Sequence, residues 1–462
     1  MKVSLFYPPE DGLPLEGGGR SFMFVPPLGL AYIAGSIEQE VDKVDIYDLR
    51  DGGTNSVDLK VIVNRSDVIG VSIASFSFYN ASLLISMIKD IDPDIPIIIG
   101  GPHCSLYPTR TLLETRADIC IVGEGDFVIK DVIKKLDDKD FLKKLQGVII
   151  KDGEKLSGIN KPIIIKNLDK LPVPAYHLLR SRYGKFFDLE FFSSKCTGVE
   201  TSRGCPFRCR FCSREIAGMN VYRAKSAERV IRELDYVTDL GYRSIVIIDD
   251  NFLIGKTRAE KILRSIIDRK MGLEIFLQGV RIDSVDDSIC KLMKKAGVVA
   301  IAFGIESGSQ KVLDFYRKGI DLEQIRRVVK LCAENDIYTI GNFIMGAPVE
   351  TRKDIENTIR FAKSLPLDFS LFFILEYTAG SDLWKAAVSE GKIDEDEYRV
   401  YADSSRGLTK FSLEELKHYQ KKAYISFYAD PRYMLRELRS AIKRNRTHLA
   451  KYVYVLFKHI LR

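Results

Sequence analysis

Residues 203–214 read RGCPFRCRFCSR and place three cysteines in a C-x3-C-x2-C run: Cys205, Cys209 and Cys212. Thiolates this close together are typical metal ligands, but a structural zinc site needs a fourth side chain at a short spacing. The next cysteine is Cys290, and the nearest histidine is His177, upstream of the run. An iron-sulfur cube held by three thiolates leaves one iron open to a small molecule. The run therefore favours such a cluster over zinc.

The composition bounds the class of protein. A chain of 462 residues with 46% hydrophobic and 29% charged residues is typical of a globular protein with two to four domains. Five further cysteines stand alone, which favours buried thiols in a reducing compartment over a disulfide framework. The N-terminal sequence has no signal-peptide pattern, and no apolar run reaches the length of a membrane span. We expect a cytoplasmic protein.

The charge is concentrated at the C-terminal end. The chain has a net charge of +7, but residues 432–462 alone carry nine Lys or Arg and one acid. The rest is close to neutral and offers no broad basic face, so we expect no nucleic-acid partner. The basic stretch keeps apolar residues at three-to-four spacing, as in helices that lie on anionic membranes. A domain-closing helix with a solvated face is the alternative.

The first 140 residues alternate apolar strands with helices, which predicts a doubly wound parallel sheet of Rossmann or flavodoxin type. The expected strands begin near residues 2, 41, 67, 95 and 117. No G-x-G-x-x-G fingerprint follows the first strand, so a nicotinamide dinucleotide is not expected. Small residues gather where later strands end, where ligands of such sheets bind; each glycine alone also fits a simple turn. These residues are Ser72, Ser75, Gly100, Gly101, Gly123 and Gly125.

The second half of the chain predicts another α/β domain. Residues 141–195 have weak periodicity and a proline-rich stretch, which indicates a linker. From 196 to 385, strands recur every 25 to 40 residues with helical patterns between them, as in a full or partial barrel. A helical, basic region follows at 386–462. The cysteine run lies on a loop that enters the carboxyl ends of the barrel strands, where barrel enzymes carry their chemistry.

The cysteine run resembles that of the radical SAM superfamily, which implies a partial (β/α)6 barrel holding a [4Fe-4S] cluster that S-adenosylmethionine chelates. The resemblance implies that Phe211 faces the adenine and that Glu306 and Ser307 contact the ribose and methionine. Asp249 and Asp250 stand where the family more often has Gly-Gly-Glu, and an acid still offers an acceptor to the amino group. Gly346, in IMGAPVE, matches the I-x-G-x-x-E backbone contact to adenine.

The N-terminal domain looks like that of cobalamin-binding radical SAM enzymes, with PPLGLAYIAG, GGPH, GEG and LPVPAYHLL in order. For His103, a hydrogen-bonded structural role is the alternative to a cobalamin contact. The cobalamin contacts that the resemblance implies are Ser72, Ser75, Gly100, Gly101, His103, Gly123 and Glu124. DLRDGG at 48–53 mimics a D-x-H-x-x-G cobalamin motif with Arg for His, but it follows the second expected strand and not the first. No imidazole from that motif is expected on cobalt.

The resemblance implies a methyltransferase acting on an unactivated carbon or phosphorus centre through a 5'-deoxyadenosyl radical and methylcobalamin. A cyclase, oxidase or ring-rearranging enzyme with the same cofactors is the alternative, and an iron-sulfur electron-transfer or sensor protein is a second one. A methylthiotransferase needs another cysteine trio, and only Cys104 and Cys120 occur in the first domain. The implied partners are a small-molecule or lipid-like substrate and a reductant such as flavodoxin or ferredoxin. No catalytic residue is assigned.

Overall fold

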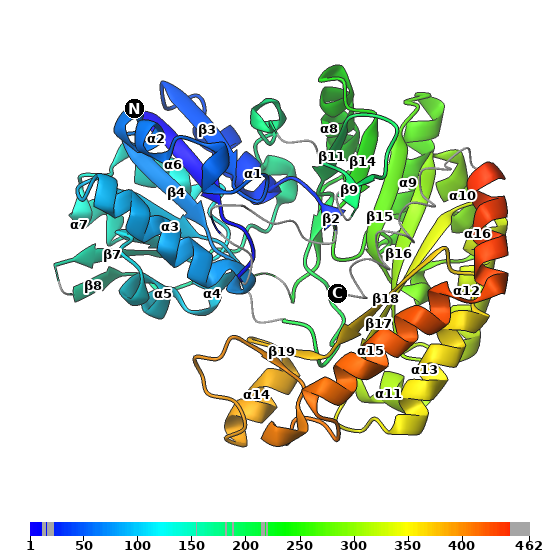
Figure 1. The fold of residues 1–462 in the computed structure, drawn as a ribbon. Coiled ribbons are helices and arrows are strands. Elements are labelled where there is room, and N and C mark those ends of the chain that lie inside the picture. The colour runs from blue at the N-terminus through cyan, green and yellow to red at the C-terminus, as the bar shows by residue number, and fades with distance from the viewer. Residues whose placement is uncertain are drawn as a thin grey trace. The chain divides into compact units, whose positions relative to one another are not determined.

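The computed structural model describes residues 1–11, 15, 23–153, 155–180, 183–186, 189–213, 218 and 220–443. The chain divides into two compact units. The N-terminal unit consists of Met1–Tyr183 and Glu215–Lys225, and the C-terminal unit consists of Gly184–Arg214 and Ser226–Arg462. Figure 1 draws the large sheet of the first unit in blue to teal and the large sheet of the second in green to yellow.

The N-terminal unit is built on a seven-stranded sheet. Its parallel part has the order β3 (Lys43–Asp48), β1 (Lys2–Tyr7), β4 (Val68–Ser72), β5 (Ile97–Gly100) and β6 (Ile119–Ile121). By order of appearance this is 2-1-3-4-5, the flavodoxin-like arrangement of a doubly wound fold. All five strands are parallel, and it is the strand order that reverses between β1 and β4, so the predicted α/β class is confirmed and a ligand crevice is expected at their carboxyl ends.

Helices cover both faces of this sheet, which explains why its strands read as continuous apolar runs. They are α1 (Leu28–Ile37), α2 (Leu59–Arg65), α3 (Phe78–Ile91), α4 (Pro102–Leu106), α5 (Pro108–Glu114), α6 (Val128–Lys134) and α7 (Lys139–Leu142). The start of the predicted linker differs from the expectation. Residues 148–158 form the antiparallel hairpin β7 (Val148–Asp152) and β8 (Lys155–Gly158), which extends the sheet beyond β6. Two short strands joined by a tight turn leave little periodicity to detect.

The C-terminal unit contains a six-stranded, all-parallel sheet whose strands lie side by side in chain order. They are β11 (Cys196–Val199), β14 (Ser244–Ile247), β15 (Glu274–Val280), β16 (Val298–Glu306), β17 (Tyr338–Met345) and β18 (Phe369–Ile374). The helices between them are α8 (Ala227–Asp239), α9 (Lys256–Asp268), α10 (Asp287–Lys295), α11 (Gln310–Phe315), α12 (Leu322–Glu334) and α13 (Arg352–Ser364). This is the predicted partial (β/α)6 barrel.

Short elements complete the two units. Two-residue strands are β2 (Met23–Phe24), β9 (Lys185–Phe186), β10 (Leu189–Glu190), β12 (Ser202–Arg203) and β13 (Arg223–Ala224). After the barrel come β19 (Glu376–Thr378), α14 (Asp382–Ser389), β20 (Arg399–Tyr401), α15 (Leu413–Tyr428) and α16 (Pro431–Lys443). The tyrosine hydroxyl of Tyr428, on α15, bonds the backbone of Ser370 and so ties this helix to β18.

The described helices include none that is both long enough and apolar enough to cross a bilayer. Within the predicted C-terminal helical region, the described residues form the helices α15 and α16, which end at residue 443, and also the strand β20. The apolar positions expected between Leu449 and Ile460 lie outside the described residues.

Candidate cluster and cofactor sites

The three cysteines of the C-x3-C-x2-C run lie on the loop that leaves the carboxyl end of β11. Cys205 and Cys209 are half-buried and Cys212 is exposed, whereas the five other cysteines are buried, as the sequence predicts. Over the described residues, no three His, Cys, Asp or Glu side chains converge on one point as ligands of a single ion do. A cube of four irons is several ångströms across, and its thiolates stand farther apart than such ligands. The three thiols lie on one loop and none of them is buried, as the predicted cluster requires.

Two aspartates at the carboxyl end of β14 hold the start of this loop. Asp249 is buried, and its carboxylate accepts hydrogen bonds from the backbone N–H of Thr201 at 2.6 Å and from the hydroxyl of Ser202 at 2.6 Å. Burial raises the pKa of Asp249, against these hydrogen bonds. Asp250 is exposed and accepts the N–H of Gly204, next to Cys205, at 3.0 Å. Asp249 is thus committed to the protein, while Asp250 remains accessible to a ligand.

Aromatic side chains of the cysteine loop rest on residues that follow β15 and α11. The guanidinium of Arg281 lies 3.6 Å from the ring centre of Phe207. Phe211 packs edge-on against Tyr316, with ring centres 5.0 Å apart, and the carbonyl of Tyr316 accepts the N–H of Arg210 at 3.2 Å. Cation–π and edge-to-face contacts of this kind fix ring orientation. They hold the cysteine loop over the carboxyl ends of β15 and β16.

A buried ion pair stands beside Phe211. The carboxylate of Glu306, at the end of β16, lies 2.6 Å from the ammonium of Lys318, and both side chains are 7% exposed. Glu306 has a positive φ of 68°, which non-glycine residues rarely adopt and which concentrates at functional sites. A Cβ at Gly304 would lie 2.4 Å from the Glu306 carboxylate, so this glycine makes room for the pair.

The turn after β17 is held by a buried acid. Gly346, with φ 105°, donates its N–H to Glu350 at 2.6 Å, and Ala347 donates to the same oxygen at 3.2 Å. The other carboxylate oxygen of Glu350 is buried and makes no hydrogen bond. Burial raises the pKa of Glu350 to about 7, against the two backbone hydrogen bonds. Glu350 fixes the Gly346 backbone that the resemblance assigns to adenine.

The structure places Ser307 differently from its predicted partners. Its side chain is fully buried, and its hydroxyl lies 3.1 Å from that of Thr358 on α13. The predicted residues Phe211, Asp250, Glu306 and Gly346 share the carboxyl end of the barrel, because parallel strands end at one edge. Sequence reasoning missed Arg281, Tyr316 and Lys318, which no spacing relative to the cysteines singles out.

Predicted cobalamin contacts in the N-terminal unit follow β4 and β5. The hydroxyl of Ser75 lies 3.1 Å from Nδ1 of His103, whose ring packs against Phe78 with centres 4.6 Å apart. His103 is fully buried, and this burial lowers its pKa to about 4, so the imidazole is neutral near pH 7. The buried imidazole is thus hydrogen-bonded and packed against an aromatic ring, and its contact with cobalamin stays a prediction.

Glycines at these strand ends differ in what they leave open. A Cβ at Gly101 would lie 2.7 Å from the carbonyl of Ile73, and one at Gly123 would lie 2.3 Å from that of Ile163. Both have positive φ, so the chain's own backbone requires glycine there. A Cβ at Gly100 would meet nothing closer than 3.9 Å. Gly100 is therefore not required by the chain's own packing, and the Ser72 beside it is half-buried.

Glu124, also predicted to contact cobalamin, forms a nearly buried ion pair within the N-terminal unit. Its carboxylate lies 2.6 Å from the guanidinium of Arg223 and also accepts the N–H of Ile165. Arg223 further donates to the Ile165 carbonyl at 2.7 Å. Two residues later, the ammonium of the fully buried Lys225 lies 2.5 Å from the hydroxyl of Tyr32. These contacts dock the segment that follows the cysteine loop onto the N-terminal unit.

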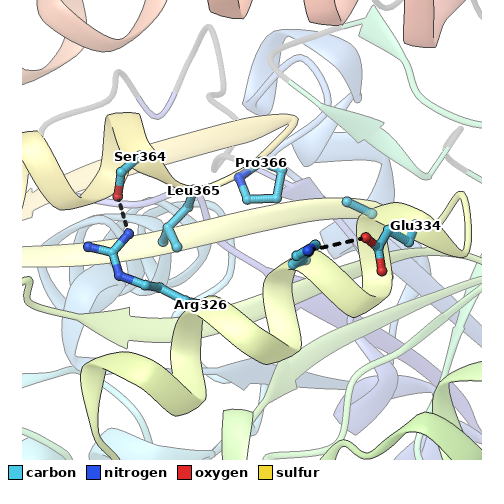
Figure 2. Close-up of a pocket in the computed structure, with 7 residues that line it drawn as sticks. Arg326, Glu334, Ser364, Leu365 and Pro366 are labelled. Carbon is cyan, nitrogen blue, oxygen red and sulfur yellow. Dashed lines mark hydrogen bonds and ion pairs between the residues drawn. The ribbon is translucent and has the colours of Figure 1, made fainter.

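A surface cavity of about 510 Å³ lies at the opposite end of the barrel. Figure 2 shows it between α12 and the loop that precedes β18, with Arg326 donating to the hydroxyl of Ser364 at 2.7 Å. Leu365 and Pro366 form its apolar part. Because barrel enzymes carry their chemistry at the carboxyl ends of the strands, this cavity is separate from the candidate site.

Two family models match this chain: the radical SAM superfamily over residues 199–362, and the B12 binding domain over residues 19–133. An uncharacterized methyltransferase of Pyrococcus horikoshii is 32% identical over 95% of this chain and 95% of its own length. The chain belongs to the radical SAM superfamily. With its B12-binding domain, it is a radical SAM enzyme whose cofactors are a [4Fe-4S] cluster, S-adenosylmethionine and cobalamin.

Solved structures of this class share the fold. The radical S-adenosylmethionine methyltransferase TsrM of Kitasatospora setae, with cobalamin and a [4Fe-4S] cluster bound, aligns with a TM-score of 0.67 at 16% identity, over 84% of this chain and 75% of that one. The cobalamin-dependent radical enzyme OxsB aligns with a TM-score of 0.70 at 18% identity, over 96% and 71%. The predicted pairing of a doubly wound domain with a partial barrel is confirmed.

Proposed function

We propose that this enzyme transfers a methyl group from cobalamin to an unactivated carbon or phosphorus centre of a small molecule. The observation that carries the proposal is the joint presence of the partly exposed cysteine loop and a flavodoxin-like B12-binding unit in one chain. The 32% identical relative from Pyrococcus horikoshii, named a methyltransferase, supports transfer of a methyl group over cyclisation or oxidation.

Each residue at the barrel mouth has a proposed role. Cys205, Cys209 and Cys212 hold the cluster, and Asp249 fixes the loop that carries them. Asp250 offers its accessible carboxylate to the amino group of S-adenosylmethionine, and Phe211 and the Gly346 backbone flank the adenine. When bound, the cluster and S-adenosylmethionine supply an organic radical, and cobalamin supplies the methyl group.

The ion pair of Glu306 and Lys318 is proposed to orient S-adenosylmethionine at the same edge. Its low exposure excludes water from the neighbourhood of Phe211, which strengthens polar contacts there. The resemblance assigns Glu306 and Ser307 together, but the hydroxyl of Ser307 is engaged with α13. We therefore propose Glu306 as the contact to ribose or methionine and Ser307 as a residue that positions it.

In the N-terminal unit, the crevice beyond β4 and β5 is the proposed cobalamin site, with Ser72 and Gly100 facing the ligand. Ser75, Gly101 and Gly123 shape the loops, and Glu124 positions the segment after the cysteine run. His103 is neutral and packed among aromatic rings, so we assign it no bond to cobalt. A reductant such as flavodoxin or ferredoxin and a cytoplasmic location complete the proposal.

The test is anaerobic purification followed by assay of iron, sulfide and cobalamin in the same preparation. The protein is then incubated with methyl-labelled S-adenosylmethionine and a low-potential reductant. We expect label in the extracted cobalamin, together with 5'-deoxyadenosine. Deoxyadenosine with no label in cobalamin would favour a cyclase or oxidase, and an absence of both products would favour an electron-transfer or sensor role.

A further inference from the structure

The C-terminal helix α16 is docked on the barrel by one of its faces. The hydroxyl of Tyr433 donates to the carbonyl of Asp368 at 2.9 Å, and the guanidinium of Arg436 donates to the carbonyl of Leu367 at 2.5 Å. Tyr433 and Glu437, one turn apart, are 4% and 6% exposed. The orientation of the helix about its own axis is therefore fixed by its contacts with the loop before β18.

The opposite face of α16 is apolar and open to solvent. Met434, Leu435 and Leu438 are 57%, 50% and 57% exposed, and their spacing puts them together on one side of the helix. Figure 1 draws α16 in red on the outside of the C-terminal unit. A contiguous group of exposed large apolar side chains on a docked helix is a mark of an interaction surface.

The exposed charges of α16 are basic, and so is the sequence that follows it. Arg439 is exposed on the helix, and the single acid of α16, Glu437, is buried. Residues 440–462 contain six Lys or Arg and no Asp or Glu. The carbonyl of Leu365, which lines the cavity of Figure 2, accepts a hydrogen bond from Arg436, so α16 docks at this end of the barrel. An apolar stripe bordered by cations complements an anionic bilayer surface.

The position of α16 leaves the candidate active site clear. The helix bonds to residues 365–368, which precede β18 and so lie at the amino end of the barrel strands. The cysteine loop, Asp250 and Glu306 lie at the carboxyl end. A flat surface bound at the amino end therefore does not close the mouth through which a substrate enters.

We propose that the outward face of α16, made of Met434, Leu435 and Leu438, binds the enzyme to membranes that contain anionic lipid. The apolar side chains enter the headgroup boundary, and the basic residues beside them pair with lipid phosphates. This attachment is peripheral and reversible, and it is independent of the proposed methyl transfer.

The test measures co-sedimentation of the full chain with two kinds of vesicle, phosphatidylglycerol mixed with phosphatidylcholine and phosphatidylcholine alone. We expect binding to the first kind only, and a loss of binding as salt is raised. The triple variant Met434→Ser/Leu435→Ser/Leu438→Ser should bind these vesicles at least about tenfold more weakly than the wild type. The matched control Tyr79→Ser/Leu83→Ser/Leu113→Ser removes three apolar side chains that are 69%, 52% and 59% exposed on the other unit, and it should bind as the wild type does.

Three outcomes would overturn the proposal. The first is equal binding by the wild type and the α16 triple variant, or none by either. The second is a wild-type dimer in gel filtration that the triple variant converts to a monomer, because a second copy would then cover the face. The third is tighter vesicle binding by a chain that ends at Lys443, since residues 444–462 would then be what covers the outward face of α16 in the full chain. Equal iron and cobalamin contents in all variants establish that each is folded.

Discussion

Glu306 and Lys318 form an ion pair, with Oε1 and Nζ 2.6 Å apart, inside a site where both side chains are 7% exposed. Glu306 ends β16 and Lys318 follows α11, so the pair fixes that α11 turn against the strand end. Lys318 also lies 5.9 Å from the ring centre of Phe211, in the cysteine loop. This salt bridge thus joins the end of β16 to the segment after α11, and it lies next to the cysteine loop.

Removing one partner of this pair leaves a buried charge without compensation. We expect Lys318→Met and Glu306→Gln each to lower the free energy of unfolding by about 3 to 5 kcal/mol. The double variant should be more stable than either single one. Chemical denaturation at matched cluster content measures this. In the exposed pair of Lys261 and Glu228, Lys261→Met should change stability by less than about 1 kcal/mol.

Alanine at Cys205, Cys209 or Cys212 should abolish the cluster, because each thiolate is one of the three proposed protein ligands. Iron and sulfide analysis and the visible absorption of anaerobically purified protein measure the loss. Cys196→Ala and Cys332→Ala serve as controls, since both thiols are buried away from the loop. A Cys209→Ala protein with full iron and sulfide would contradict the assignment.

Changing each of the two neighbouring aspartates to asparagine should have different effects on cluster content and on the affinity for S-adenosylmethionine. Asp249→Asn weakens the hydrogen bonds to Thr201 and Ser202, so we expect reduced cluster content. Asp250→Asn should keep the cluster and bind S-adenosylmethionine at least about tenfold more weakly, as the loss of a charged hydrogen bond predicts. Equilibrium dialysis measures the affinity. Asp268→Asn, an exposed change on α9, should alter neither quantity.

Stability should depend on pH through Glu350. Its pKa is raised from 4.5 to about 7 by burial, so the folded chain holds this proton more tightly than the unfolded chain does. The contribution of Glu350 is therefore most favourable below about pH 4.5 and is lost as pH rises through about 7, by roughly 3 kcal/mol at most. Glu350→Gln removes this titration. The difference in unfolding free energy between wild type and variant, measured from pH 5 to 8, should change in that direction; a constant difference would refute it.

The sequence predicts the larger features of the fold because they depend on local pattern. Continuous apolar runs such as IPIIIGG mark strands buried on both faces, and the amphipathic segments between them mark helices. The hairpin β7–β8 was missed because the apolar run of β7 is only three residues long and β8 has no buried residue. The sequence predicts two α/β domains with a linker at 141–195 and a helical region at 386–462, whereas the structure divides into two units. The return of residues 215–225 to the N-terminal unit has no local signature.

The candidate site was predictable only where a motif carries it. The cysteine run, Phe211 and Gly346 follow from spacing and resemblance. Lys318 and Tyr316 come close to the cysteine loop through packing, over more than a hundred residues of chain, so no local pattern reveals them. The resemblance also assigns both Asp249 and Asp250 to the amino group of S-adenosylmethionine. Their different exposure depends on how the loop from Thr201 to Gly204 folds back on β14.

The return of Glu215–Lys225 to the N-terminal unit bears on how the protein can be dissected. A fragment of residues 1–183 alone would lack Arg223 and Lys225, so Glu124 would lose its ion pair and Tyr32 its hydrogen bond. The complementary fragment would expose those two cations to solvent. To produce either unit by itself, the eleven residues 215–225 should be joined to the first fragment, because a single cut in the chain leaves them with the wrong unit.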